Sequence, residues 1–160
     1  MLNQKQNTYL IFILFLILAA LVSAYMIEYK LGHEPCKLCI YERIPYFLAI
    51  FFIIEVLFFK RNVKITLLIL SVIFIISAGL AFYHFGIEQG FFSESFVCKG
   101  KNFEETLSKE QLLENLKQNT LSCKNVSFKI IGLSLAAINT IFSIFLSIIF
   151  IRLFKNYGKN

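Results

Sequence analysis

Four long apolar segments alternate with polar stretches along the chain. Three of them carry no charged residue and the other only Glu55: Thr8–Ile27, Ile44–Phe59, Ile65–Tyr83 and Ile130–Ile151. A helix needs about 20 apolar residues to cross the hydrocarbon core of a bilayer. Three segments reach that length, and the second does so if its helix starts near Cys39. The pattern predicts an all-α membrane protein built as a bundle of four transmembrane helices.

We expect one integral membrane domain over residues 1–160, with spans near 8–27, 40–59, 65–83 and 130–151. Two periplasmic loops, 28–39 and 84–129, then join the spans on one side. Pro45 falls in the first turns of the second span, where a missing N–H costs least, and is expected to fix the helix start.

The second loop is long and is expected to contain a short amphipathic helix. Apolar residues recur there at helical intervals among charged and polar ones, at Phe103, Leu107, Leu113 and Leu116. We expect this helix to pack over the bundle, with the membrane surface as the alternative.

The composition agrees with a membrane protein. Of the 160 residues, 58% are hydrophobic, and the mean hydropathy is +0.70, whereas soluble domains are about 45–50% apolar. A cleaved signal peptide is the alternative for the first segment, since Lys5 precedes it and Val22-Ser23-Ala24 fits a cleavage site. The length of this segment and the three spans after it favour a retained helix.

Basic residues in short loops predict the orientation. The densest cluster is Lys60, Arg61 and Lys64, between the second and third segments, which should therefore lie in the cytoplasm. Both termini then fall on the cytoplasmic side. The net charge of +6 reflects this topology and not nucleic-acid binding. Glu55, near the inner end of its span, is expected to reach the interface or to pair with Lys60 or Lys64.

All cysteines fall in the two loops on the opposite side: Cys36, Cys39, Cys98 and Cys123. In a bacterium that side is the oxidising compartment, so Cys36 with Cys39 and Cys98 with Cys123 can each form a bridge. Two structural disulfides are one alternative. A zinc site is disfavoured, because the second pair lacks the close spacing of usual zinc ligands, and we expect no bound metal.

The C-x-x-C pair is better suited to redox exchange than to a structural role, because a bridge across so short a loop stabilises little. If a helix begins near Cys39, its unpaired N–H groups and its dipole favour a thiolate there. Arg43 can share that face, so both effects should lower the pKa of Cys39. A thiolate released from a loop disulfide can attack a second disulfide at the membrane edge, which would move electrons inward.

A lipid-soluble acceptor is expected next to Cys39. The sequence carries no dinucleotide, flavin or haem motif, which leaves a quinone as the candidate. Arg43 is expected to stabilise both the thiolate and a reduced quinone oxygen, and His84 to donate near the same rim. The alternatives are an interfacial anchor for Arg43 and a plain interface residue for His84.

With these residues in place, the chain resembles the DsbB family of quinone-dependent thiol oxidases. The likeness extends over the whole chain and rests on Pro35-Cys36-x-x-Cys39-Ile40-Tyr41-Glu42-Arg43, Tyr83-His84-x-Gly86-x-Glu88, the pair Cys98 and Cys123, and Gly132-Leu133-Ser134. The chain departs from the family in having no tryptophan, with Phe128 in the region after Cys123.

The resemblance implies an inner-membrane enzyme that reoxidises a periplasmic DsbA-like protein with a thioredoxin fold and passes electrons to ubiquinone or menaquinone. Cys98 would form the mixed disulfide with the partner, and Cys123 would exchange with Cys36. Cys39 would meet the quinone in a charge-transfer or covalent adduct, assisted by Arg43 and His84. The implied partners are the DsbA-like protein and membrane lipid, without nucleic acid.

Two alternatives stay open. One is a thiol oxidase like vitamin K epoxide reductase, in which the catalytic C-x-x-C lies late in the chain, whereas here it opens the second span. The other is a transporter or scaffold with structural disulfides. A transporter would need ionisable or helix-breaking residues at mid-membrane, which the spans lack apart from Glu55 and Pro45.

Overall fold

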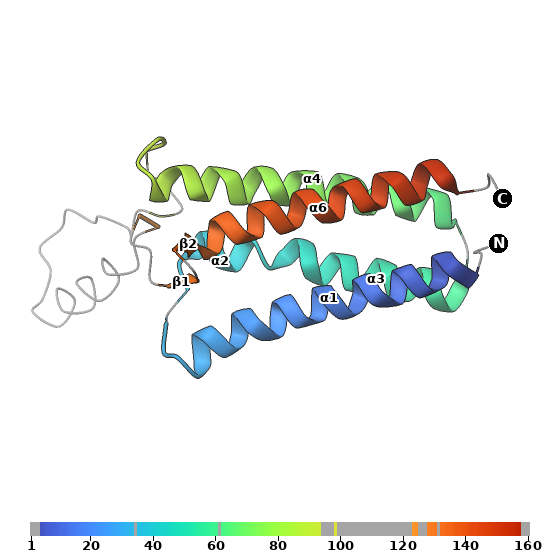
Figure 1. Cartoon of the computed structure of the whole chain (residues 1–160), viewed down its shortest axis with the longest axis horizontal. Helices are drawn as coiled ribbons and strands as arrows, with labels where there is room; N and C mark the ends of the chain where they lie inside the picture. The colour runs from blue at the N-terminus through green and yellow to red at the C-terminus, as the bar shows by residue number, and fades with distance from the viewer. Residues whose placement is uncertain are drawn as a thin grey trace, which may run out of the picture.

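Four main helices lie side by side in the structure, a computed structural model that describes residues 4–33, 35–60, 62–93, 98, 123–124, 128–130 and 132–157. A short helix and a small antiparallel hairpin lie at one end of them (Figure 1). In chain order the elements are α1 (Gln4–Tyr29), α2 (Lys37–Tyr41), α3 (Ile44–Phe59), α4 (Val63–Glu88), β1 (Lys129–Ile130), β2 (Leu133–Ser134) and α6 (Leu135–Asn156).

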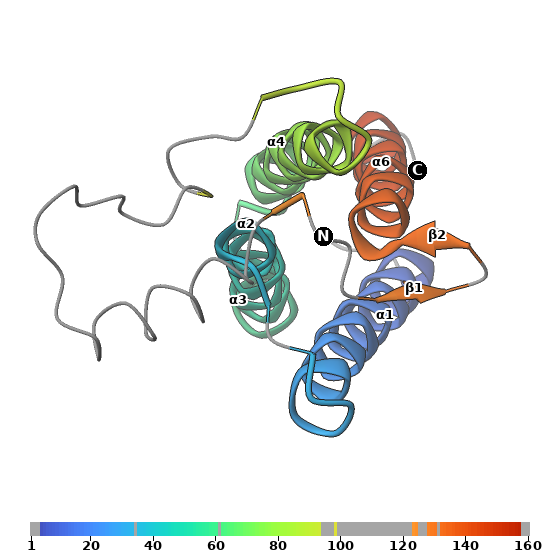
Figure 2. The ribbon, with the colours of Figure 1, turned by 90° about the vertical axis from the view of Figure 1, so that its left-hand side faces the viewer.

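The helices pack in two layers. Helix α4 lies along α6 as the most extensive pair, α3 packs on α4, and α1 packs on α3; Figure 2 shows this arrangement along the bundle. Helix α1 begins and α6 ends at the same end of the bundle, whereas α2 and the hairpin lie at the other (Figure 1). The cysteine-bearing segments and the chain ends are therefore at opposite ends.

Each helix buries one stripe and leaves the rest of its surface apolar. In α1, Leu10, Ile13, Ile17 and Leu21 recur every three or four residues and are buried. Large apolar side chains also cover the outside, which suits contact with lipid tails. Among the described residues, α1, α4 and α6 are long and apolar enough to cross a membrane. The predicted all-α membrane bundle is confirmed to this extent.

The second predicted span, 40–59, is not one continuous helix. Pro45 has no N–H to bond the carbonyl of Tyr41, and its ring would clash with that carbonyl. Accordingly, α2 ends at Tyr41, Glu42 and Arg43 form a turn, and α3 restarts at Ile44 with Pro45 in its first two positions. Pro45 fixes a helix start as expected, but it also breaks the predicted span.

The expected loop boundaries shift as well. Helix α4 runs to Glu88, so His84 is helical and not the first residue of a loop. The β hairpin over residues 129–134 occupies the end of the predicted loop and the first residues of the last predicted span, 130–151, and its turn includes Gly132 at a φ of 80°. The predicted amphipathic helix, 103–116, lies outside the described residues.

Two further features concern the small residues between α4 and α6 and the predicted ion pair of Glu55. Ser77 and Ser143 meet at the contact of α4 and α6, with their hydroxyl oxygens 3.1 Å apart, but Gly79 is exposed. Among the described ion pairs, none joins Glu55 to Lys60 or Lys64. The ammonium of Lys64 lies over the ring of Phe154 instead.

Ser134 should contribute measurably to stability, because its hydroxyl accepts a hydrogen bond from the Ala137 N–H (3.2 Å) and so caps α6. We expect Ser134→Ala to lower the free energy of unfolding by about 1 kcal/mol, measured by denaturation in detergent. Ser23→Ala is the matched control, since the Ser23 hydroxyl donates to the Ala19 carbonyl within its own helix and caps no helix end. Equal loss in both variants would contradict a capping role.

Candidate active site

Two free thiols lie at the end of the bundle that carries α2. Cys36 caps the start of α2, and its sulfur accepts a hydrogen bond from the Cys39 N–H (3.2 Å). The Cys39 sulfur, one turn later, lies 2.7 Å from that of Cys36 and is not bonded to it. Cys36 is buried and Cys39 partly buried. Helix α2 thus presents a dithiol able to close into a disulfide without moving the backbone.

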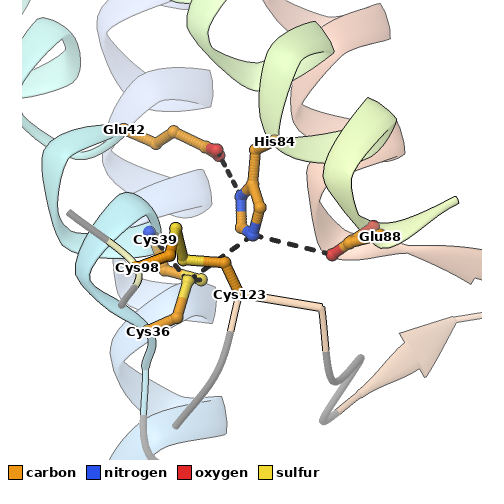
Figure 3. Close-up of a disulfide and its surroundings, with 7 residues drawn as sticks. All are labelled: Cys36, Cys39, Glu42, His84, Glu88, Cys98 and Cys123. Atoms are coloured by element: carbon orange, nitrogen blue, oxygen red, sulfur yellow. Dashed lines mark hydrogen bonds and ion pairs between the residues drawn. A yellow bond between two sulfur atoms is a disulfide. The ribbon is translucent and has the colours of Figure 1, made fainter. Parts of the chain in front are cut away.

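His84 links this dithiol to the bundle. Its Nε2 lies 3.5 Å from the Cys36 sulfur, and its Nδ1 lies 2.6 Å from the Glu42 carboxylate (Figure 3). A carboxylate can only accept, so Nδ1 carries the proton and Nε2 faces the thiol. A second carboxylate oxygen, Oε1 of Glu88, lies 3.8 Å from Nε2. The imidazole is 3% exposed, which excludes the interface alternative for His84.

A chain of polar side chains extends from Glu42 into the bundle. The Asn139 amide donates to the second Glu42 oxygen at 2.6 Å, and the Tyr46 hydroxyl donates to the Asn139 carbonyl oxygen. Tyr46 also lies 3.3 Å from the Ser143 hydroxyl. These contacts join the turn after α2 to α3, α4 and α6, so they fix where the imidazole points.

The two thiols have opposite acidities. The pKa of Cys36 is lowered from 9.0 to about 5, chiefly because its sulfur accepts a hydrogen bond from the Cys39 thiol. Burial opposes this shift, whereas the hydrogen bond and the charge of His84 add to it. The same pairing with Cys36, together with burial, raises the pKa of Cys39. The expectation that Cys39 is the acidic thiol of this dithiol is wrong. Helix α2 begins at Lys37, two residues before Cys39, which makes Cys36 the capping residue.

Arg43 does not contact a thiol in this conformation. Its guanidinium donates to the Glu28 carboxylate of α1 at 2.6 Å and lies over the Tyr25 ring, 4.6 Å from the ring centroid. Arg43 therefore connects the turn before α3 to α1, at the edge of the site.

The loop disulfide lies against the dithiol. Cys98 and Cys123 are bonded to each other, with Cα atoms 5.5 Å apart. Both share one buried cluster with Cys36, Leu38 and Ile87, and Cys39 packs against it; Figure 3 shows the four sulfur-bearing side chains together. The loop disulfide is buried, since Cys98 is only 8% exposed and Cys123 only 1%.

A cavity of about 470 Å³ opens beside the dithiol. Helices α1 and α6 supply most of its wall, through apolar residues such as Leu16, Ala20 and Phe142. At its polar end lie Cys36, Cys39, Arg43 and His84, all of the predicted residues outside the loop disulfide. The volume and mostly apolar lining are typical of sites for organic molecules.

The same group of atoms also has the composition of a metal site. Ligand atoms of Cys36, Cys39 and His84 lie within 4.8 Å of one another. This set differs from the set of four cysteines considered from the sequence, because Cys98 and Cys123 are bonded to each other.

Sequence reasoning missed the carboxylate and amide partners. Glu42 and Glu88 stand inside the quoted motifs but received no role, and Glu28 and Asn139 received none either. A polar residue near the end of an apolar span, as at Asn139, is the signal that could have pointed to this network.

Comparison with known proteins gives a consistent result. The chain matches the family model described as disulfide bond formation protein DsbB over residues 6–153. An uncharacterized protein of Rickettsia prowazekii is 31% identical over 161 residues, which cover 98% of this chain and 93% of the relative. Disulfide bond formation protein B of Xylella fastidiosa is 28% identical over 121 residues, 72% of this chain and 70% of the relative. No solved structure matches significantly.

Cys36 should be the reactive thiol of the dithiol at low pH. Because the thiolate is the nucleophile, alkylation of Cys36 by iodoacetamide should be half-maximal near pH 5, since the pKa of Cys36 is lowered to about 5. The rate should stay constant above that region and fall about tenfold per pH unit below it. Quenched reactions analysed by mass spectrometry measure both sites.

His84→Gln should move this midpoint upward, since the contact with His84 lowers the pKa of Cys36. His33→Gln, at the other histidine that lines the cavity, should leave it unchanged. A midpoint near the ordinary value of 9.0 in the native chain would contradict the assignment.

Proposed function

The chain belongs to the DsbB family of disulfide bond formation proteins, and from this premise we propose that it is an inner-membrane thiol oxidase that reoxidises a periplasmic DsbA-like protein and reduces a membrane quinone. One observation carries the proposal. The loop disulfide Cys98–Cys123 packs against the dithiol Cys36 and Cys39, which itself lies at the polar end of an apolar cavity.

The proposed topology places the thiols in the periplasm and both termini in the cytoplasm. Helix α3 has 16 residues, a length of about 24 Å, and so falls short of the roughly 30 Å hydrocarbon core. Helix α2 and the turn at Glu42 and Arg43 complete this fourth crossing. Lys60 and Lys64 lie at the opposite end from the dithiol, which supports a cytoplasmic position for that end.

Electrons enter through the loop disulfide. A thiolate of the DsbA-like partner attacks the Cys98 sulfur, the Cys98–Cys123 bond breaks, and the second partner thiol resolves the mixed disulfide. The partner leaves oxidised and the loop pair is reduced by two electrons. The Cys123 thiolate then attacks Cys36 in the Cys36–Cys39 disulfide and releases Cys39, after which Cys98 resolves the Cys36–Cys123 bond.

The thiol states in the structure match the end of this exchange. The loop pair is oxidised and the dithiol is reduced, so two electrons lie beside the cavity. Stabilisation of the Cys36 thiolate favours this direction, because a dithiol whose reduced form is stabilised is a stronger oxidant. Glu42 supports the effect as a positioning residue, since it holds the His84 ring against Cys36.

The cavity fits a quinone. Its apolar walls suit an isoprenoid chain, and its polar end offers Arg43, His84 and the Cys39 thiol to a ring with two carbonyl oxygens. When bound, a quinone supplies an acceptor for two electrons and two protons. Cys36 and Cys39 lose the two electrons as their disulfide re-forms. The Cys39 thiol releases one proton, and the protonated His84 beside the Cys36 thiolate is placed to donate the other.

Arg43 stabilises the Cys39 thiolate once Cys36 is bonded to Cys123. The pairing with Cys36 is the largest cause of the high pKa of Cys39, and this cause disappears when Cys36 is bonded to Cys123. The Cys39 thiolate then needs a cation, and Arg43 is the guanidinium that lines the same cavity. Glu28 holds it there until the thiolate forms.

Neither alternative gains support. The family match favours a DsbB-type protein over a vitamin K epoxide reductase-like one, and a scaffold with structural disulfides has no need of a thiol whose pKa is about 5.

Turnover tests the proposal. We expect the purified chain to reduce ubiquinone or menaquinone when given a reduced DsbA-like protein, followed by quinone absorbance. Single variants Cys36→Ser, Cys39→Ser, Cys98→Ser and Cys123→Ser should each lose at least about 10³-fold in rate, because each step needs its sulfur. Absence of turnover by the native chain, with its thiols intact, would overturn the oxidase proposal.

Arg43→Gln should separate the two half-reactions. We expect the KM for quinone to rise about ten- to a hundredfold, the worth of a charged hydrogen bond. Reduction of the Cys98–Cys123 disulfide by the DsbA-like protein, trapped by acid and resolved on gels, should proceed at the native rate, because Cys39 takes no part in that step. Lys37→Gln removes an exposed cation of α2 as the control. Equal losses in both half-reactions would assign Arg43 a structural role only.

A further inference from the structure

The reduced site has the donor set of a soft-metal site. The sulfurs of Cys36 and Cys39 and Nε2 of His84 lie within 4.8 Å of one another, and the Cys36 sulfur lies 3.5 Å from Nε2. Zinc binds thiolates at about 2.3 Å and imidazole at about 2.0 Å in tetrahedral geometry, which separates two ligand atoms by about 3.5 Å. The two sulfurs, now 2.7 Å apart, need only a small side-chain rotation to reach it.

The Glu88 carboxylate supplies an independent observation that favours a cation here. Its side chain is 6% exposed, and its Oε2 is buried without a hydrogen-bond partner among the described residues. Its Oε1 lies 3.8 Å from Nε2 of His84, the ring nitrogen that also faces Cys36, and Figure 3 shows Glu88 on the opposite side of that nitrogen from the thiols. An unsatisfied buried carboxylate oxygen is costly, and a cation held by the neighbouring donors would satisfy it.

The charges around the thiols favour a cation as well. Glu42 from the α2–α3 turn and Glu88 from α4 both flank His84. The guanidinium of Arg43 is engaged by Glu28 of α1, and Asn139 of α6 is neutral. The reduced dithiol therefore adds negative charge to a buried region that already holds two carboxylates, against the single positive charge of the protonated His84 imidazole.

We propose that the reduced dithiol is a binding site for a thiophilic divalent cation such as Zn²⁺, held by Cys36, Cys39 and His84 with Glu88 as the fourth ligand. Binding replaces the protons of the dithiol and of His84 Nε2, which are released to solvent, and transfers no electron. The oxidised pair offers no thiolate, so the site exists in one redox state only. The expected consequence is that the bound cation traps the chain in its reduced state, and this consequence rests on the proposed function. The binding of the cation does not depend on that function.

The test uses the full-length chain in detergent, reduced and freed of reductant, and titrated with Cd²⁺ and Co²⁺. We expect one ion per chain, with thiolate-to-metal absorption in the near ultraviolet and the intense visible bands of tetrahedral Co²⁺. Zn²⁺ should displace both ions. The oxidised chain should give neither signal. These spectra need no variant, so they are informative even if a substitution impairs folding.

Matched variants assign the ligands. His84→Ala and Glu88→Gln should weaken Cd²⁺ binding by at least about tenfold, whereas His33→Ala, at the only other histidine of the chain, should have no effect. The double variant Cys98→Ser/Cys123→Ser should bind as the native chain does. Loss of the signal in that double variant, or native affinity in His84→Ala, would overturn the proposal.

Inhibition is measured separately. Zn²⁺ should stop quinone reduction and a chelator should restore it. If metal binds to a chain that lacks oxidase activity, the proposed function fails and the metal site stands. If the chain turns over quinone but gives no metal spectrum when reduced, the metal site fails and the proposed function stands.

Discussion

The buried hydrogen bond between His84 and Glu42 is the interaction on which the site depends. It joins α4 to the turn between α2 and α3, and Asn139 extends it to α6. All three side chains lie within the apolar bundle, where a polar group without a partner is costly and the loss of one member of a charged pair costs about 3–5 kcal/mol. The network is therefore a strong constraint on how the helices meet. Because the thiols extend from the same turn, the constraint on the helices also fixes the thiols against the imidazole.

This constraint gives the two cysteines of a short motif different chemistry. Cys36 receives the Cys39 N–H, the Cys39 thiol and the imidazole, so its negative charge is shared among three donors. Cys39 borders the cavity, and the nearby cation Arg43 is bound to Glu28. The motif alone does not distinguish them, since both lie near the start of a helix. The distinction comes from a capping position and from a side chain 48 residues away in the sequence.

The sequence predicted what depends on local pattern. Apolar length identified α1, α4 and α6, and the position of all cysteines outside the apolar segments identified the end of the bundle at which they meet. The sequence-based prediction failed where a tertiary contact or a single hydrogen bond determines the boundary of a helix. The span over 40–59 breaks because Pro45 cannot bond Tyr41, and α4 continues past Tyr83 because its polar end residues, His84 and Glu88, are buried at the site. Glu42 and Asn139 could not be paired from the sequence, because hydropathy records that a residue is polar and not which partner it meets.

Burial of the loop disulfide links chemistry to conformation. Cys123 is 1% exposed and Cys98 is 8% exposed, and both pack on Cys36 and Leu38. This packing excludes water from the Cys36 thiolate and strengthens its interaction with the imidazole, since electrostatic interactions grow as the local dielectric falls. In the proposed exchange, the same packing covers the Cys98 sulfur that the thiolate of the partner attacks. Attack on Cys98 therefore requires that part of this cluster open, and once it opens the thiolate loses some of its protection. A partner that binds at this end of the bundle would supply the free energy for that opening, so docking and exchange are coupled through one buried cluster.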